Sequence, residues 1–111
     1  MSLRRERVAD QIRDVVSRRL QGGRMDDPRL QGVVITFAKV SSDLQVCTIY
    51  FRYTNDAIEV TDVLKGLESA SGHFRALMAR SLGLRRVPQL RFFFDESIEN
   101  ASRIEHLISQ L

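Results

Sequence analysis

The sequence predicts an α+β fold, a single domain in which helices cover one face of a three-stranded sheet. Apolar residues recur at helical spacing near both ends and in the middle of the chain. Two β-rich stretches flank a short polar turn, and a third follows a long helical crossover. Such a crossover makes the third strand parallel to one member of the hairpin. The 111 residues, 43% of them hydrophobic, suffice for one core but not for two domains.

The first predicted element is a helix, which we expect to end at Gly22-Gly23. Its apolar residues recur at helical spacing and are Val8, Ile12, Val15, Val16 and Leu20. A largely basic stripe borders them and consists of Arg7, Gln11, Asp14 and Arg18, with Arg4 nearby. The spacing leaves two interpretations open, a solvated surface or a surface that meets a polyanion. Residues 26–29, Asp-Asp-Pro-Arg, follow as a turn.

Residues 33–40 and 46–53 are rich in β-branched and aromatic side chains, and the polar turn 41–44 joins them. They predict an antiparallel hairpin. One face of the second strand presents Cys47, Ile49, Phe51 and Tyr53, and the other presents Val46, Thr48, Tyr50 and Arg52. Cys47, the only cysteine, is therefore expected in the core. Tyr50 and Arg52 could stack a base, or Tyr50 could simply lie on an open sheet face, which is commoner.

An apolar stripe at helical spacing then runs from Val60 to Met78, and Gly83 ends it. Gly72 lies inside this stripe. A glycine within a helix costs about 1 kcal/mol relative to alanine, so we expect a kink or a division into two helices there. The small residues Ala70-Ser71-Gly72 would let a backbone or a phosphate approach closely.

The last predicted elements are a strand and a helix. Leu90, Phe92 and Phe94 alternate with Arg91 and Phe93, which is the period of a strand with one buried face. Pro88 fits the beginning of that strand because it has no N–H for the ladder. The cap residues of the final helix are Asp95, Glu96 and Ser97, and its apolar residues are Ile98, Ala101, Ile104, Leu107 and Ile108.

Charge is segregated along the chain. The net charge is +3, and 15 of the 17 basic residues are arginine, whose planar fork pairs with phosphate and stacks on bases. The stretch from Ser69 to Phe94 has no acidic residue and five arginines, which are Arg75, Arg80, Arg85, Arg86 and Arg91. This clustering indicates a polyanionic partner.

Several classes of function receive no support from the sequence. No apolar run is long enough for a membrane span or forms a signal peptide, so we expect a cytoplasmic protein without membrane contact. His73 and His106 lie far apart and have no cysteine partner, so neither a metal site nor another cofactor is expected. The sequence gives little indication of an enzyme. It has no Gly-rich phosphate loop, and no nucleophile lies at a motif spacing from a His and an Asp. Asp95-Glu96 could be a carboxylate pair for acid/base work, but helix capping explains it better.

Four sets of motifs carry a family resemblance. They are Arg7-Val8-Ala9; Asp27-Pro28-Arg29-Leu30; Val40-Ser41-Ser42-Asp43-Leu44; and Ala70-Ser71-Gly72 with Leu84-Arg85-Arg86-Val87-Pro88 and Phe92-Phe93-Phe94-Asp95-Glu96-Ser97. In this order and spacing the chain resembles the ribosome-binding factor A family, which has a type II KH-like fold. The resemblance covers nearly the whole chain and implies a single KH-like RNA-binding domain over residues 1–111, in the order α-β-β-α-kink-α-β-α.

The resemblance also implies a function. A member of this family is expected to bind free 30S small ribosomal subunits or their precursors through 16S rRNA near the decoding region. It is expected to assist late 30S assembly and 16S rRNA 5′-end maturation without catalysis, notably in the cold. Further assembly factors, a GTPase among them, are candidate partners, and we expect a monomer. The chain departs from the family at Asp26, where lysine is frequent, at Ser42, where proline is frequent, and in stopping at Leu111, where many members have a tail.

The resemblance places Ala70-Ser71-Gly72 where RNA-binding KH domains have the G-x-x-G loop that clamps single-stranded nucleotides. We expect a helix N-terminus after Gly72 to offer N–H groups to a phosphate, and His73 to donate or stack. The full set predicted to contact RNA is Arg4, Arg7, Arg18, Ala70, Ser71, Gly72, His73, Arg75, Arg80, Arg85, Arg86 and Arg91. An alternative is a protein-interaction module that uses the sheet face around Tyr50 and Phe93.

Overall fold

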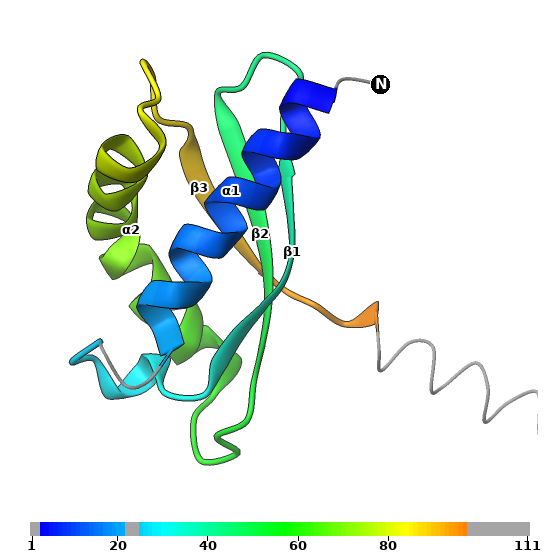
Figure 1. Cartoon of the computed structure of the whole chain (residues 1–111). Helices are drawn as coiled ribbons and strands as arrows, with labels where there is room; N and C mark the ends of the chain where they lie inside the picture. Colours follow the sequence, from blue (N-terminus) through cyan, green and yellow to red (C-terminus); the bar gives the residue numbers. More distant parts are fainter. Residues whose placement is uncertain (1–2, 22–24, 98–111) are drawn as a thin grey trace, which may run out of the picture.

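The computed structural model describes residues 3–21 and 25–97. Its elements, in chain order, are α1 (Leu3–Leu20), the 3₁₀ helix η2 (Pro28–Leu30), β1 (Val33–Val40), β2 (Val46–Tyr53), α2 (Val60–Leu82) and β3 (Gln89–Phe94). The strands lie in the order β1-β2-β3, with β1 antiparallel and β3 parallel to β2. The predicted hairpin, the helical crossover and the α+β class are therefore confirmed. Figure 1 shows α1 crossing in front of the sheet, with α2 beside it.

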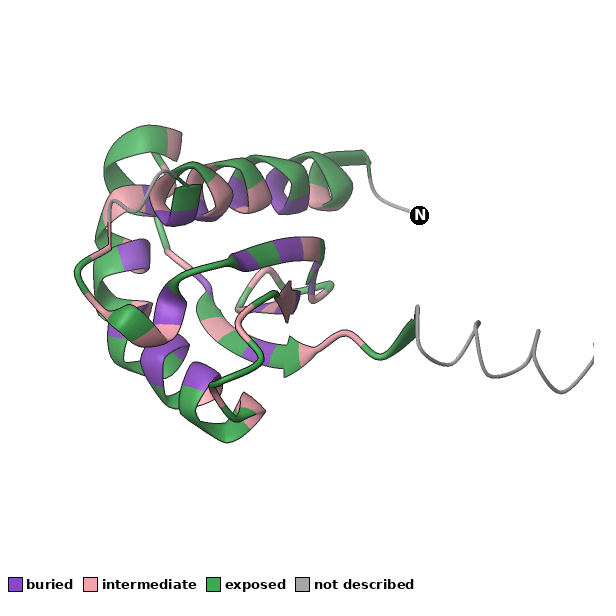
Figure 2. Cartoon of the chain, turned by 90° about the horizontal axis from the view of Figure 1, so that it is seen from below, coloured by how far each residue is buried: buried purple, intermediate pink, exposed green. Residues whose placement is uncertain are grey.

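The core lies between the two long helices and one face of the sheet. Its largest fully buried side chains are Phe51, Phe74, Ile12, Leu30, Ile49, Leu67 and Met78. Figure 2 shows the buried residues of the helices and strands turned toward one another. Cys47 lies in this core, as predicted, and burial raises the pKa of its thiol to about 12. The thiol is consequently protonated and unreactive near neutral pH.

Helix α1 begins at Leu3, earlier than its first buried residue, Val8. Its buried side chains, Val8, Ala9, Ile12, Val16 and Leu20, form the predicted stripe. The exposed residues beside this stripe include Arg7 and Arg18. The predicted helix stop at Gly22-Gly23 lies outside the described residues. Among the described residues, neither this helix nor α2 is long and apolar enough to cross a membrane.

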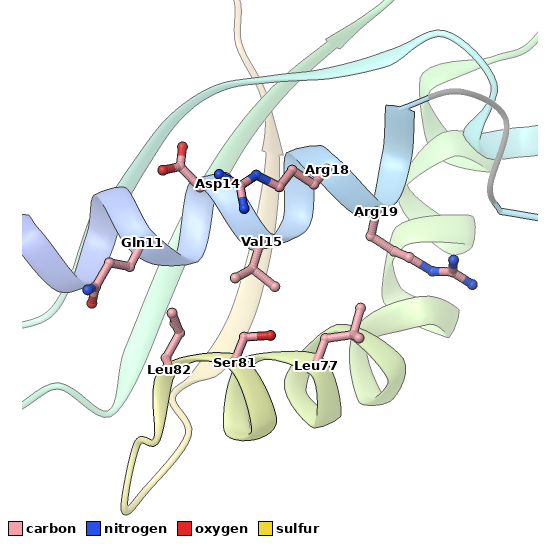
Figure 3. A pocket seen from close by; sticks show the side chains of 8 residues that line it. All are labelled: Gln11, Asp14, Val15, Arg18, Arg19, Leu77, Ser81 and Leu82. Carbon is pink, nitrogen blue, oxygen red and sulfur yellow. The ribbon is translucent and has the colours of Figure 1, made fainter.

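Helix α2 corrects one prediction. Residues Val60–Leu82 form one uninterrupted α-helix, so Gly72 does not divide it into two helices. The helix does change direction about midway, as Figures 1 and 3 show, which agrees with the predicted kink. Its end is as predicted, because Gly83 has φ 59°, a left-handed conformation that glycine adopts without steric cost.

Strand β1 contains an irregularity that alternation does not predict. Its pairing with β2 shifts between Ile35 and Phe37, so that Thr36 is the extra residue of a β-bulge. The buried residues are Val33 and Ile35 before the bulge, and Ala38 and Val40 after it.

The chain beyond β3 is described only to Ser97. There the Ser97 N–H donates to Asp95 Oδ1 at 2.9 Å, which is the local capping contact predicted for this position. The predicted final helix, with Ile98, Ala101, Ile104, Leu107 and Ile108, lies outside the described residues.

Candidate nucleic-acid interface

A groove of about 560 Å³ lies at one end of the molecule. The beginning of α1, the β1–β2 turn and the segment between α2 and β3 meet there, at the top of Figure 1. Four of the predicted arginines line it, namely Arg4, Arg75, Arg85 and Arg86. We call this site the arginine groove. Its one acidic lining residue is Asp43, so the groove carries a surplus of positive charge.

The Arg85-Arg86 pair is presented by a segment that is fixed at both ends. The left-handed Gly83 turns the chain out of α2, and the Gln89 N–H donates to the Gln45 carbonyl at 2.9 Å, which starts β3 beside β2. Both arginines are exposed between these two points. Their guanidinium groups are therefore carried by an anchored segment and face solvent.

Arg75 has a different role in this groove. Its Nε donates to the Pro88 carbonyl at 3.1 Å and its Nη2 donates to the Val87 carbonyl at 3.0 Å. These bonds tie α2 to the segment that carries the arginine pair. Arg75 thus positions Arg85 and Arg86, and two of its donors are not available to phosphate.

The opposite wall of the arginine groove is the β1–β2 turn. Ser41 Oγ donates to Asp43 Oδ1 at 2.7 Å, and the Gln45 N–H donates to the same oxygen at 3.1 Å. The Ser41 hydroxyl, followed by the Gln45 N–H, lowers the pKa of Asp43 below its usual range. Leu44 completes the turn with φ 61°. Asp43 is consequently used to shape the turn.

A second groove, of about 470 Å³, separates α1 from the last part of α2. Arg18 and Arg19 of α1 line it, together with Leu77 and Ser81 of α2. Figure 3 shows the Arg18 side chain extending along α1 toward Asp14. Arg19 Nε donates to His73 Nε2 at 2.8 Å, which links the two helices. His73 is exposed, and its Nε2 accepts this bond, so this nitrogen is not a free donor for RNA. Sequence patterns gave no signal for this pair, because its members are far apart in the chain.

The Ala70-Ser71-Gly72 segment does not have the predicted anion-binding geometry. Since α2 is continuous, no helix begins after Gly72, and the N–H groups there belong to a helix interior, where they bond to carbonyls one turn earlier. Ala70 is buried, Ser71 is half-buried and Gly72 is exposed. The prediction that free N–H groups of this segment bind a phosphate is therefore wrong. What remains is an open surface at Gly72, where an added Cβ would meet no atom within 4 Å.

The remaining predicted residues do not share one surface. Arg7 and Arg80 are exposed on α1 and α2 but line neither groove. Arg91 pairs with Thr48 in the sheet and is exposed on the face away from the buried side chains of β3. The structure therefore gathers only Arg4, Arg75, Arg85 and Arg86 in a single groove. Arg91 lies apart from these four arginines, on the sheet face away from the helices.

A small KH-like α+β domain with a basic groove at one end has the architecture of an RNA-binding domain. No group of three or more His, Cys, Asp or Glu residues within 3–21 and 25–97 could hold a metal ion. The model of the ribosome-binding factor A family matches residues 4–108. The chain belongs to that family.

Two relatives show how closely the sequence matches. Ribosome-binding factor A of Sorangium cellulosum (strain So ce56) is 40% identical over 111 residues, covering 97% of this chain and 88% of that protein. Its counterpart in Arthrobacter sp. (strain FB24) is 39% identical over 105 residues, covering 95% of this chain and 62% of that protein. The chain thus spans less than two thirds of the Arthrobacter relative.

Solved structures agree with the fold. The crystal structure of ribosome-binding factor A from Thermus thermophilus matches with a TM-score of 0.74 and 24% identity, covering 84% of this chain and 97% of that chain. A homology model of the Thermus thermophilus protein, fitted into the cryo-EM map of a 30S–RbfA complex, matches with a TM-score of 0.65 and 25% identity. That match covers 79% of this chain and 91% of the other.

Proposed function

We propose that this protein binds the 30S ribosomal subunit through 16S rRNA and acts non-catalytically in late 30S assembly. The observation that carries the proposal is the arginine groove, where Arg4, Arg85 and Arg86 converge from α1 and from the segment before β3. The Thermus thermophilus relative that was fitted into a 30S–RbfA map supports the choice of partner. Assistance to maturation of the 16S rRNA 5′ end belongs to the same proposal.

The groove recognises rRNA by its phosphates. Each exposed guanidinium presents several N–H donors in a plane, and paired donors match two phosphate oxygens. Arg85 and Arg86 are adjacent in sequence and both exposed, so they meet successive or facing phosphates of a folded RNA. Phosphate contacts of this kind fix position and orientation but do not read bases.

Binding of 30S subunits by an Arg85→Ala/Arg86→Ala variant tests the groove. We expect its affinity to fall by roughly 10- to 100-fold, since a charge-assisted hydrogen bond is worth about 1.5–3 kcal/mol. The slope of log affinity against log salt should also fall by about one unit per lost phosphate contact. Sedimentation of the protein with purified 30S subunits at several salt concentrations measures both quantities.

The control is Lys65→Ala/Arg80→Ala. This variant removes the same charge from two exposed positions of α2 that do not line the arginine groove. If the groove is the binding site, the control keeps most of the affinity of the unmodified protein. Equal losses in the two variants would show that net charge, and not the groove, determines binding.

A further inference from the structure

The sheet face away from the helices carries three aromatic rings side by side, one from each strand. Phe37 of β1 pairs with Tyr50 of β2, which pairs with Phe93 of β3. The ring centroids of Phe37 and Tyr50 are 6.0 Å apart, as are those of Tyr50 and Phe93. Phe37 is 52% and Phe93 49% exposed. We call these three residues the aromatic row.

The β-bulge places Phe37 in this row. In a regular strand Phe37 would have the phase of Val33 and Ile35 and would point into the core. Thr36, as the extra residue, reverses the phase, so that Phe37 faces out and Ala38 faces in. The Thr36 hydroxyl donates to Asp95 Oδ2 at 2.5 Å and lies 3.3 Å from the Tyr50 carbonyl oxygen. Bulges commonly re-aim a side chain at functional sites.

Basic residues border the aromatic row. Lys39, Thr48 and Arg91 are aligned across the three strands in the neighbouring row, which places an exposed cation at each edge of the sheet. None of the outward-facing residues of β1, β2 and β3 is acidic. This combination of aromatic rings and cations suits a polyanion that also has flat apolar faces.

We propose that the aromatic row binds a single-stranded RNA segment. Bases stack on Phe37, Tyr50 and Phe93, while Lys39 and Arg91 pair with the phosphates. Stacking of unpaired bases on sheet aromatics is a general mode of RNA recognition. This goes beyond the arginine groove, since the two sites share no residue.

The test measures binding of a fluorescein-labelled single-stranded RNA of about ten nucleotides by fluorescence anisotropy, with the full chain and with Phe37→Ala/Phe93→Ala. We expect a loss of roughly 5- to 100-fold for each base that is no longer stacked. The matched control is Val34→Ala, which trims an apolar side chain that is 56% exposed on the same strand but outside the row. It should bind as the unmodified protein does.

Two further variants keep the test decisive. Phe37→Tyr/Phe93→Tyr keeps both rings, so it should retain binding and also show that these positions tolerate substitution. Lys39→Ala/Arg91→Ala leaves the rings intact and should lower the salt slope by about one unit for each lost phosphate contact. If either expectation fails, the proposal that RNA bases stack on this face while its cations pair with phosphates is overturned.

The outcomes separate this inference from the proposed function. If the aromatic variant binds the RNA as tightly as the unmodified protein does, the inference is overturned, whatever the arginine-groove variant does with 30S subunits. If it binds RNA normally but no longer binds a purified protein of the 30S subunit, the row is a protein-docking surface and the inference is again overturned. Weakened RNA binding together with normal 30S binding by the Arg85→Ala/Arg86→Ala variant supports the inference and overturns the groove.

Discussion

Asp95 joins the end of β3 to the bulge of β1. Its carboxylate accepts hydrogen bonds from the Ser97 N–H and from the Thr36 hydroxyl, and the Arg52 guanidinium donates to its backbone carbonyl at 2.7 Å. The hydrogen bonds from Ser97, then that from Thr36, with a smaller contribution from the charge of Arg52, lower the pKa of Asp95 from 3.8 to about 2. The ionised carboxylate is thus the form that the folded state favours.

This shift predicts a pH-dependent effect of Asp95→Asn. A carboxylate whose pKa is lower in the folded state stabilises the protein above its unfolded pKa, and this stability is lost as the pH falls through the folded pKa. The variant should therefore unfold at lower urea concentration than the unmodified protein above about pH 5. The difference should shrink below that and disappear only as the pH falls through about 2, the lowered value. Urea midpoints at a series of pH values measure it, and a difference that stays constant down to about pH 2 would contradict the assignment.

At the scale of elements, α2 contains two glycines with different surroundings. A Cβ on Gly72 would meet nothing within 4 Å, whereas a Cβ on Gly66 would lie 3.1 Å from Leu30 Cδ2 and 3.2 Å from Arg29 Cβ. Gly66 therefore allows α2 to lie close against η2. In the sequence, Gly72 is conspicuous because it lies within an apolar stripe. Only the packing shows that Gly66 is the glycine that lies close to η2.

Alanine substitutions of the two glycines should differ in their effects on stability. Gly72→Ala should raise the free energy of unfolding by about 0.5–1 kcal/mol, because alanine loses less backbone entropy in a helix. Gly66→Ala gains the same helix propensity but crowds η2, so it should be less stable than Gly72→Ala. Urea unfolding monitored by circular dichroism compares them. A destabilised Gly72→Ala would show that the bend of α2 itself requires glycine at this position.

At the scale of the molecule, the sequence predicts the fold better than the interface. The bounds of β1 and β2, the parallel third strand and the buried Cys47 follow from periodicity and composition, which act over a few residues. The site depends on contacts between distant residues. Examples are the bonds of Arg75 to the segment before β3 and the pairing of Arg19 with His73. Whether Phe37 faces the core or the solvent depends on the β-bulge at Thr36. The sequence does not reveal this bulge, because the residues on both sides of Thr36 are apolar.

At the scale of the whole molecule, the two proposed RNA-binding surfaces share no residue, and this predicts how their variants combine. Effects of independent sites on free energy add, so their effects on affinity multiply. The combination of Arg85→Ala/Arg86→Ala with Phe37→Ala/Phe93→Ala should weaken 30S binding by the product of the two separate losses. Quantitative sedimentation with 30S subunits, with circular dichroism to confirm folding, measures the affinities of the three variants and of the unmodified protein. If the combined variant binds 30S subunits as tightly as the weaker-binding of the two separate variants, only one surface contacts the subunit. In that case, substitution of the second surface has no further effect on affinity.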